Sequence, residues 1–219
     1  MNAFILPLFL LLHSQGAYLP PDAFVDTPDD QEYQDFMEEI YGSIFADLGK
    51  ESLWKLSQTD SNAEAYRLLV IAPGTTPTVF HLYKTSANGW SLEVTRLEYD
   101  SDDNGTIVEF IKIAPDQTSA LKIKSLFQSN TVWDYPTAYD FTADCPPPNP
   151  DGTQNCVVVC SHSAIYLLER VENGQYAFRD ENKCPRDRGA DVVPIINAFG
   201  RSAYPEGHEL LERFLWWAE

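Results

Sequence analysis

The chain has 219 residues, 44% of them hydrophobic and 13% aromatic, so it can bury a core and is not disordered as a whole. Its 33 acidic residues against 15 basic ones give a net charge of −18. A field of that sign repels phosphate backbones and anionic lipid headgroups, which argues against nucleic acid and acidic membranes as partners. Cationic proteins, cationic ligands and metal ions remain open as partners.

The chain begins with a segment typical of an export signal. A nine-residue apolar run, Phe4–Leu12, is followed by small residues at Ser14 and Gly16. We therefore expect a signal peptide over residues 1–16, cut between Gly16 and Ala17, and a periplasmic or secreted protein. The run is too short to span a bilayer, which takes about 20 residues. We therefore expect that this chain is not an integral membrane protein. No Lys or Arg precedes the run, so a buried N-terminal strand or helix remains the alternative.

The first element expected after the cut is an amphipathic helix over residues 28–48. Thr27 is the expected N-cap, and Gly49 is expected to end the helix. The apolar residues between them follow helical spacing. They are Tyr33, Phe36, Met37, Ile40, Tyr41, Ile44, Phe45 and Leu48.

The same segment carries half of the net charge, because residues 17–49 hold nine acidic residues and no basic one. If the apolar stripe faces inward, the outward acids form a free surface for a cationic protein partner, with Glu32, Asp35, Glu38 and Glu39 as the binding residues. Acids one helical turn apart repel each other, and a cationic partner would relieve that repulsion. The alternative is a solvated polar face without a partner.

A β-rich stretch follows the helix. Alternating apolar residues predict four strands, with hairpin dipeptides (Asn-Gly) at 88–89 and 104–105. The expected strands are residues 65–72, 78–85, 90–99 and 106–114. A helix over residues 115–128 then begins at a Pro-Asp pair.

One of the hairpin turns has the spacing of a calcium loop. Asp100, Asp102 and Asn104 occupy its first, third and fifth positions, and Gly105 supplies the sharp turn at the sixth. The twelfth position is Ile111, where such a loop needs a bidentate glutamate. We therefore expect weak calcium binding at most, and the alternative is a plain hairpin with solvated acids. No other cofactor is expected.

The second half of the chain alternates strands and helices again. The expected strands are residues 131–142, 156–171 and 175–181, and the expected helices are residues 190–199 and 206–218. The order Asn-Gly, strand, proline, helix occurs at 104–115 and again at 173–185, which suggests two β-hairpin–helix units. All elements together predict an α+β fold, an antiparallel sheet built from hairpins with helices packed on one face.

A Pro-rich loop over residues 144–155 is the expected domain boundary. It would separate a helix and β-rich part, residues 17–143, from a part with a hairpin and the C-terminal helices, residues 144–219. The alternative is a single domain over residues 17–219.

The four cysteines are an even number in a chain expected to be exported, so disulfides are expected. Cys156 and Cys160 lie in an extended run, about 13 Å apart at about 3.3 Å per residue, too far to bond to each other. The pairs Cys145–Cys156 and Cys160–Cys184 are preferred because they close the Pro-rich loop and tie the strand to the next hairpin. Crossed pairs and a zinc site are the alternatives.

Part of the second half resembles a known family. The residues that carry the resemblance are Trp133, Asp151-Gly152, Ile165–Glu169, Gly174-Gln-Tyr176 and Cys184-Pro185. Their order, a strand with Trp, a turn, a strand ending in Glu, a hairpin and a proline, is similar to an uncharacterised exported bacterial domain. The resemblance supports the hairpin fold and implies no activity.

No catalytic residues are predicted. A nucleophile elbow, a His-Glu-x-x-His helix and Gly-rich phosphate loops are absent from the sequence. Cys160 and His162 share a strand face, but a cysteine in a disulfide has no thiolate with which to attack. The sequence therefore favours an exported binding or inhibitory module of the immunity type for a cationic protein partner. The alternative is a secreted or periplasmic hydrolase with a scattered site that uses His162, His81 and nearby acids.

Overall fold

The computed structural model describes residues 18–21, 23, 31–85, 89–101, 105–129, 133, 164–183 and 192–218, with only the backbone of 31–33, 181–183 and 216–218. The helices are α1 (Gln31–Asp47), α2 (Leu53–Thr59), α3 (Gln117–Gln128), α5 (Val192–Ala203) and α6 (Glu209–Ala218). The strands are β1 (Glu64–Ile71), β2 (Thr78–Lys84), β3 (Trp90–Tyr99), β4 (Gly105–Ile113), β5 (Ala164–Glu172) and β6 (Gln175–Lys183).

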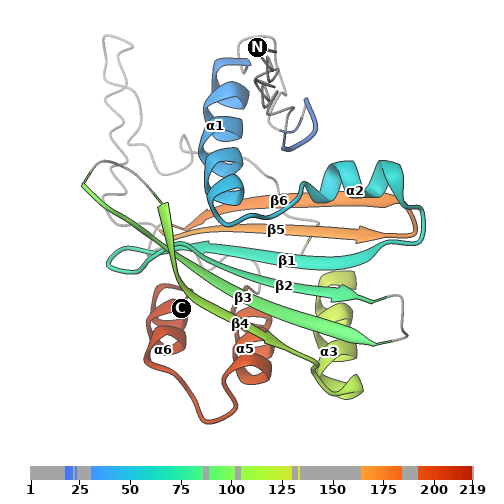
Figure 1. Ribbon diagram of the computed structural model, residues 1–219, viewed down its shortest axis with the longest axis vertical. Helices are drawn as coiled ribbons and strands as arrows, with labels where there is room; N and C mark the ends of the chain where they lie inside the picture. Colours follow the sequence, from blue (N-terminus) through green and yellow to red (C-terminus); the bar gives the residue numbers. More distant parts are fainter. Residues whose placement is uncertain are drawn as a thin grey trace, which may run out of the picture.

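The six strands form one antiparallel sheet in the order β4-β3-β2-β1-β5-β6 (Figure 1). Strands β1 to β4 follow one another as a meander, and the β5–β6 hairpin pairs with the other edge of β1, for example through Leu68 and Leu168. The predicted α+β class with an antiparallel sheet is confirmed. Segments from both sides of the 144–155 loop therefore contribute to one sheet.

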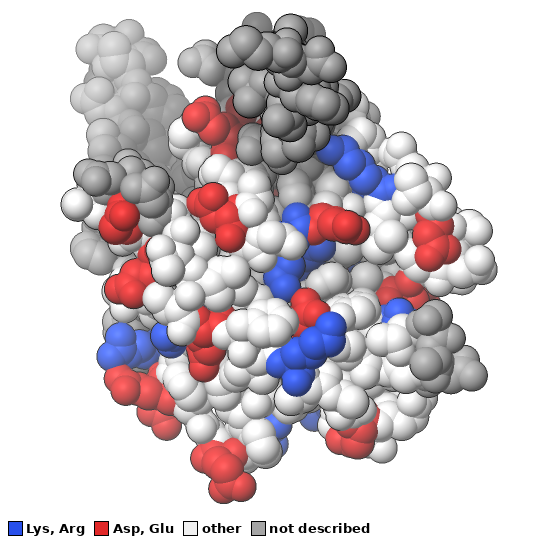
Figure 2. All heavy atoms as spheres, viewed as in Figure 1, with Lys and Arg blue, Asp and Glu red and all other residues white. Residues whose placement is uncertain are grey.

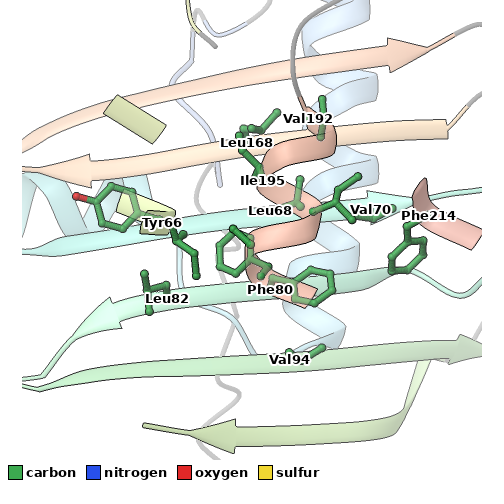
Figure 3. Close-up of a cluster of buried hydrophobic side chains, with 14 of the residues drawn as sticks. Tyr66, Leu68, Val70, Phe80, Leu82, Val94, Leu168, Val192, Ile195 and Phe214 are labelled. Carbon is green, nitrogen blue, oxygen red and sulfur yellow. The ribbon is translucent and has the colours of Figure 1, made fainter. Parts of the chain in front are cut away.

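Helices cover both faces of the sheet, so the prediction of helices on one face is wrong (Figure 1). On one face, α3, α5 and α6 pack on alternate residues of β1, Tyr66, Leu68 and Val70 (Figure 3). On the other face, α1 packs on residues between them, such as Leu69, through Phe45 and its neighbours. The reason is that the middle of β1 is buried on both sides, and a strand without a wet face needs cover on each.

The end of α1 has the geometry that its glycine predicts. Lys50 N donates to Phe45 O at 2.8 Å and Gly49 N to Ala46 O at 2.9 Å, the two hydrogen bonds of a Schellman motif. Gly49 has a φ of 62°, which glycine adopts without strain. This turn leads directly into α2, a seven-residue helix that the sequence did not indicate.

Most predicted elements of the described chain are confirmed, and their ends differ by a few residues. Strands β1 to β4 match within one residue at each end, and α3 begins after its N-cap Asp116, whose carboxylate accepts from Ser119 N at 2.9 Å. Thr27, all four cysteines and the predicted strand 131–142 except Trp133 lie outside the described residues. Where the chain is described, no helix is long and apolar enough to span a bilayer.

The two hairpins that suggested a repeat lie at opposite edges of this sheet. The β3–β4 hairpin is followed by α3 and the β5–β6 hairpin by α5. Both helices lie on the same face and contact each other. The two candidate units therefore share one core.

Candidate functional site

A cleft of about 840 Å³ lies between α1 and α2. Its charged lining residues are Asp35, Glu38 and Glu39 from α1, Glu51 and Lys50 from the connection, and Lys55 from α2. Carboxylates therefore outnumber amines in the cleft. Asp and Glu groups are interspersed with Lys and Arg groups over the face that Figure 2 shows.

The chain segment Tyr18–Pro20, called the docked segment below, is bound at one side of this cleft. The backbone nitrogens of Tyr18 and Leu19 both donate to the carboxylate of Glu38, with Leu19 N at 2.9 Å from Oε2. Ser52 Oγ donates to Tyr18 O at 2.5 Å, and Gln34 Nε2 donates to Pro20 O at 3.2 Å. Leu19 is fully buried. Side chains of α1 and of the N-cap of α2 thus hold this segment in place.

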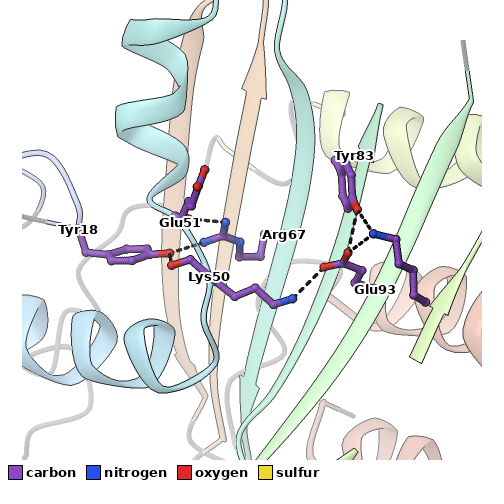
Figure 4. A network of polar contacts seen from close by, with 7 residues as sticks. Tyr18, Lys50, Glu51, Arg67, Tyr83 and Glu93 are labelled. Atoms are coloured by element: carbon purple, nitrogen blue, oxygen red, sulfur yellow. Dashed lines mark hydrogen bonds and ion pairs between the residues drawn. The ribbon is translucent and has the colours of Figure 1, made fainter. Parts of the chain in front are cut away.

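The side chain of Tyr18 connects the cleft to the sheet (Figure 4). Its ring stacks on Phe45 with centroids 4.7 Å apart. Its hydroxyl donates to Lys50 O at 2.5 Å and accepts from Arg67 Nη1 at 3.2 Å. Burial raises the pKa of Tyr18 well above its ordinary value, and the charge of Arg67 only partly opposes the rise. Tyr18 therefore remains a neutral phenol.

Arg67 is a buried cation with several partners. It forms an ion pair with Glu169 at 3.2 Å, and the two side chains are 1% and 0% exposed. It also donates to Glu51 O at 2.7 Å, and its guanidinium lies 4.9 Å from the Phe45 ring centroid. Burial is the largest single effect and lowers the pKa of Arg67, but the carboxylate of Glu169 together with the contacts of Tyr18 and Tyr176 outweighs burial, so the pKa of Arg67 is raised.

The strand register places five polar residues side by side across the sheet. Opposite one another in successive strands are Glu169 (β5), Arg67 (β1), His81 (β2), Glu93 (β3) and Lys112 (β4). Directly paired residues project to the same face, so these five form one row, called the polar row below, on the α1 side. The charged members of the polar row alternate in sign.

Glu93 is the acceptor of three hydrogen bonds. Lys50 Nζ and Lys112 Nζ each lie 2.9 Å from one of its oxygens, and Tyr83 OH donates to it at 2.7 Å. Burial alone would raise the pKa of Glu93, but these hydrogen bonds and charges lower it to about 2. Lys50, which lines the cleft, is thereby directed onto the polar row (Figure 4).

His81 lies in the middle of the polar row with its ring tilted against Tyr83, centroids 4.9 Å apart. Both ring nitrogens are buried and have no hydrogen-bond partner within the described part of the chain. Burial and the charges of Arg67 and Lys50 lower the pKa of His81 well below its ordinary value. The imidazole is therefore neutral near pH 7, and no hydrogen bond joins it to Glu93.

The acids predicted to bind a partner have different surroundings. Asp35 and Glu39 are exposed on the cleft wall. Glu38 is bound to the docked segment and Asp35 also has an interaction within the chain, so the expectation that all these acids are free is wrong. Glu32 belongs to α1, but its side chain is not among those described.

The other sequence-predicted sites fall mainly outside the described residues. Asp100 is exposed at the end of β3, while Asp102 and Asn104 are not described. Within residues 31–85, 89–101, 105–129 and the other described ranges, no three His, Cys, Asp or Glu residues gather as a metal site. His162 and Cys145, Cys156, Cys160 and Cys184 also lie outside the description.

Sequence reasoning did not single out Arg67 or Tyr18, and it named Glu169 only as the end of a strand in the resemblance. One signal for Arg67 is that it is the only charge between Ala65 and Ile71, a strand segment too apolar to have a wet face. The signal for Glu169 is weaker, because a second charge follows it directly at Arg170. Nothing local indicates that Tyr18 is docked.

Comparisons of the chain with protein-family models, curated proteins and solved structures find no match. The case for a function therefore rests on the cleft, the docked segment and the polar row.

Proposed function

We propose that this chain is an exported binding module that docks a cationic protein partner at the cleft between α1 and α2, as an inhibitory or immunity-type protein does. The observation that carries the proposal is that four carboxylates, those of Asp35, Glu38, Glu39 and Glu51, line one concave site. Lys50, one of the two lysines in the same lining, is paired with Glu93.

The geometry of the cleft wall suits a basic side chain from a partner. Glu39 is exposed and forms no hydrogen bond or ion pair with a described residue, and Asp35 is exposed four residues earlier. A cleft with protein walls concentrates the electric field of its charges, which raises the rate of encounter with an oppositely charged molecule. We therefore expect Asp35 and Glu39 to contribute mainly to the association rate.

The rigid floor of the cleft supports the same proposal. Tyr18, Lys50 and Glu51 line the cleft and are each hydrogen-bonded into the network around Arg67 and Glu93. A site whose supporting groups are already ordered loses less conformational entropy on binding. The export expected from residues 1–16 would bring the module to the partner outside the cytoplasm.

A charge-reversal experiment with a matched control tests the proposal. The cleft variant is Asp35→Lys with Glu39→Lys. The control is Glu206→Lys with Glu212→Lys, two exposed acids in the turn before α6 and in α6 itself. Both variants raise the net charge from −18 to −14, since each reversal adds two charges. A labelled oligolysine peptide serves as the probe for a basic surface.

Fluorescence anisotropy at several salt concentrations gives the affinity for this probe. We expect the cleft variant to bind roughly tenfold more weakly at low salt, since two surface charge contacts of about 0.5–1 kcal/mol each are reversed. Its salt dependence should also be flatter, while the control changes little. Equal weakening in both variants would mean that net charge and not the cleft binds the peptide, and the proposal would then be wrong.

A further inference from the structure

Strand β4 forms one outer edge of the sheet, and among the described residues no strand lies beyond it (Figure 1). Most of its side chains are exposed. They include three large apolar ones, since Ile107, Val108 and Phe110 are 45%, 41% and 56% exposed. Every second residue of an edge strand also directs its N–H and C=O groups away from the neighbouring strand. β4 therefore presents main-chain groups and apolar side chains along the same edge.

The opposite edge of the sheet, β6, is better protected. Its nine residues include an Arg, two acids and a Lys, and α2 contacts it. β4 has only two charged residues, Glu109 and Lys112, and each forms an ion pair with a residue of β3. Charged side chains are a common protection of sheet edges against pairing with another chain. The two edges are therefore not equivalent, and β4 is the one open to a further strand.

The regular part of the β4 edge is the segment Glu109–Ile113. Pairing with β3 is interrupted before it, because Val108 is the extra residue of a β-bulge. Phe110 lies on the α1 side of the sheet, where Lys50 Nζ is 5.7 Å from its ring centroid. Ile111 lies on the opposite side and packs against the apolar core. A strand added here would place its own side chains beside Phe110 on one face and Ile111 on the other.

Two acids flank the other end of β4. Asp47, in the last turn of α1, lies against Gly105, where an added Cβ would be 2.8 Å from its Oδ2. Glu98 lies in β3, opposite Thr106. Both carboxylates are exposed and have no partner within the described chain. Asp47 is also at the negative end of the α1 dipole. This end of β4 therefore favours a basic residue.

A second copy of this chain does not suit the edge. Two β4 strands related by a twofold axis pair antiparallel, and the axis keeps each side chain on its own face of the sheet. Facing residues then have numbers with an even sum, so Glu109 of one copy never faces Lys112 of the other. Each copy also carries a charge of −18, which opposes close approach. A strand from a cationic protein meets neither obstacle.

We propose that β4 is a second docking site, at which an extended segment of a cationic protein adds antiparallel to Glu109–Ile113 as a seventh strand. Main-chain hydrogen bonds hold the segment, and its apolar side chains pack beside Phe110 and Ile111. Its basic residues are at its C-terminal end, near Asp47 and Glu98, because an antiparallel segment ends where β4 begins. This inference goes beyond the proposed function, since it does not depend on the cleft between α1 and α2.

A labelled synthetic peptide tests strand addition on the whole protein. The peptide has alternating Val and Thr residues followed by two Lys residues, and a second version is N-methylated at every other residue. Fluorescence anisotropy gives the affinity, and hydrogen exchange followed by NMR shows which amides become protected. We expect the plain peptide to bind and to slow exchange at the outward N–H groups of β4. The N-methylated peptide should not bind, because it lacks the donors that pair with the edge.

Two variants with the same charge change test the place of binding. Phe110→Lys and Gln175→Lys each add one positive charge at an exposed position of an edge strand, β4 and β6 respectively. Phe110→Lys should weaken binding of the plain peptide roughly fivefold, because a cross-strand contact is lost and a like charge is added. Gln175→Lys should weaken it less than about twofold. Circular dichroism checks that both variants are folded.

Several results would overturn the inference. They are equal binding of the two peptides, equal weakening in the two variants, and no binding of the plain peptide. Protection of the outward β4 amides in the protein alone would also overturn it, because the edge would then be covered by the chain itself or by a second copy. The comparison of the two peptides needs no variant, so it stands even if Phe110→Lys fails to fold. The oligolysine test of the proposed function changes other residues, so the two proposals can fail separately.

Discussion

The two faces of the sheet use the same strands in different ways. On the face covered by α3, α5 and α6, β1 presents Tyr66, Leu68 and Val70 to an apolar core. On the face covered by α1 and α2, the same strand presents Arg67 to the polar row. The apolar face requires only matched volume and area. The polar face requires a partner for each charge, because an unpaired buried charge is costly.

The two faces therefore have separate roles, one in shaping the candidate site and the other in stabilising the fold. The partners of Arg67 are Tyr18, Glu51 and Glu169, and the first two also line the cleft. Pairing the buried charge therefore fixes the groups that shape the candidate site. The apolar face, in contrast, contributes mainly to the free energy of folding.

The largest expected loss of stability comes from a substitution in the apolar core. Phe80 is fully buried, with its ring centroid 5.5 Å from that of Phe199 and 6.4 Å from that of Phe214. Phe80→Ala should lower the free energy of unfolding by about 3–5 kcal/mol, measured by urea denaturation, because it leaves a cavity. The control Leu121→Ala, at a side chain that is 46% exposed, should change it by less than about 0.5 kcal/mol. Equal effects would contradict the assignment of Phe80 to the core.

A slightly smaller loss of stability is expected when the buried ion pair of the polar row is broken. Glu169→Leu leaves the guanidinium of Arg67 buried without its carboxylate and should cost about 3 kcal/mol in the same assay. The double variant Arg67→Met with Glu169→Leu should recover most of that loss, because no unpaired charge remains. The control Glu209→Gln breaks an exposed pair with Arg213 and should cost less than about 0.5 kcal/mol. Additive losses in the double variant would show that the buried pair is not coupled.

The smallest expected effect is a pH dependence of the stability, caused by His81 in the polar row. The pKa of His81 is lowered below 6.5 in the folded protein by burial and by Arg67 and Lys50, with Lys112 adding to the effect and Glu93 opposing it. Above about pH 6.5 the imidazole is neutral in both states and has no effect. As the pH falls below 6.5, the unfolded chain binds a proton that the folded chain cannot bind. Stability should then fall by up to about 1.4 kcal/mol per pH unit.

Urea denaturation between pH 7 and pH 5 measures this slope. His81→Gln should flatten it. The lowered pKa of Glu93, about 2, acts in a separate window, because the stability it provides is lost only as the pH falls below about 4.5. A slope that survives in His81→Gln would assign the pH dependence to other groups.

The sequence by itself predicted most local elements of the described chain. Alternating residues and Asn-Gly dipeptides located β1 to β4, and helical spacing ending at Gly49 located α1. These signals are local, because a strand or helix repeats every two or 3.6 residues and a turn depends on adjacent residues. The seven residues of α2 are too few to show such a period.

Only the tertiary structure decided which elements meet. Arg67 and Glu169 are 102 residues apart, and they pair because β5 adds to the free edge of β1 in one register. A shift of that register by one residue would turn Glu169 to the opposite face. The same holds for Tyr18, which reaches Arg67 across 49 residues. No local pattern encodes such pairings, because their free energy comes from burial and partner charges that exist only once the sheet and both helix layers are assembled.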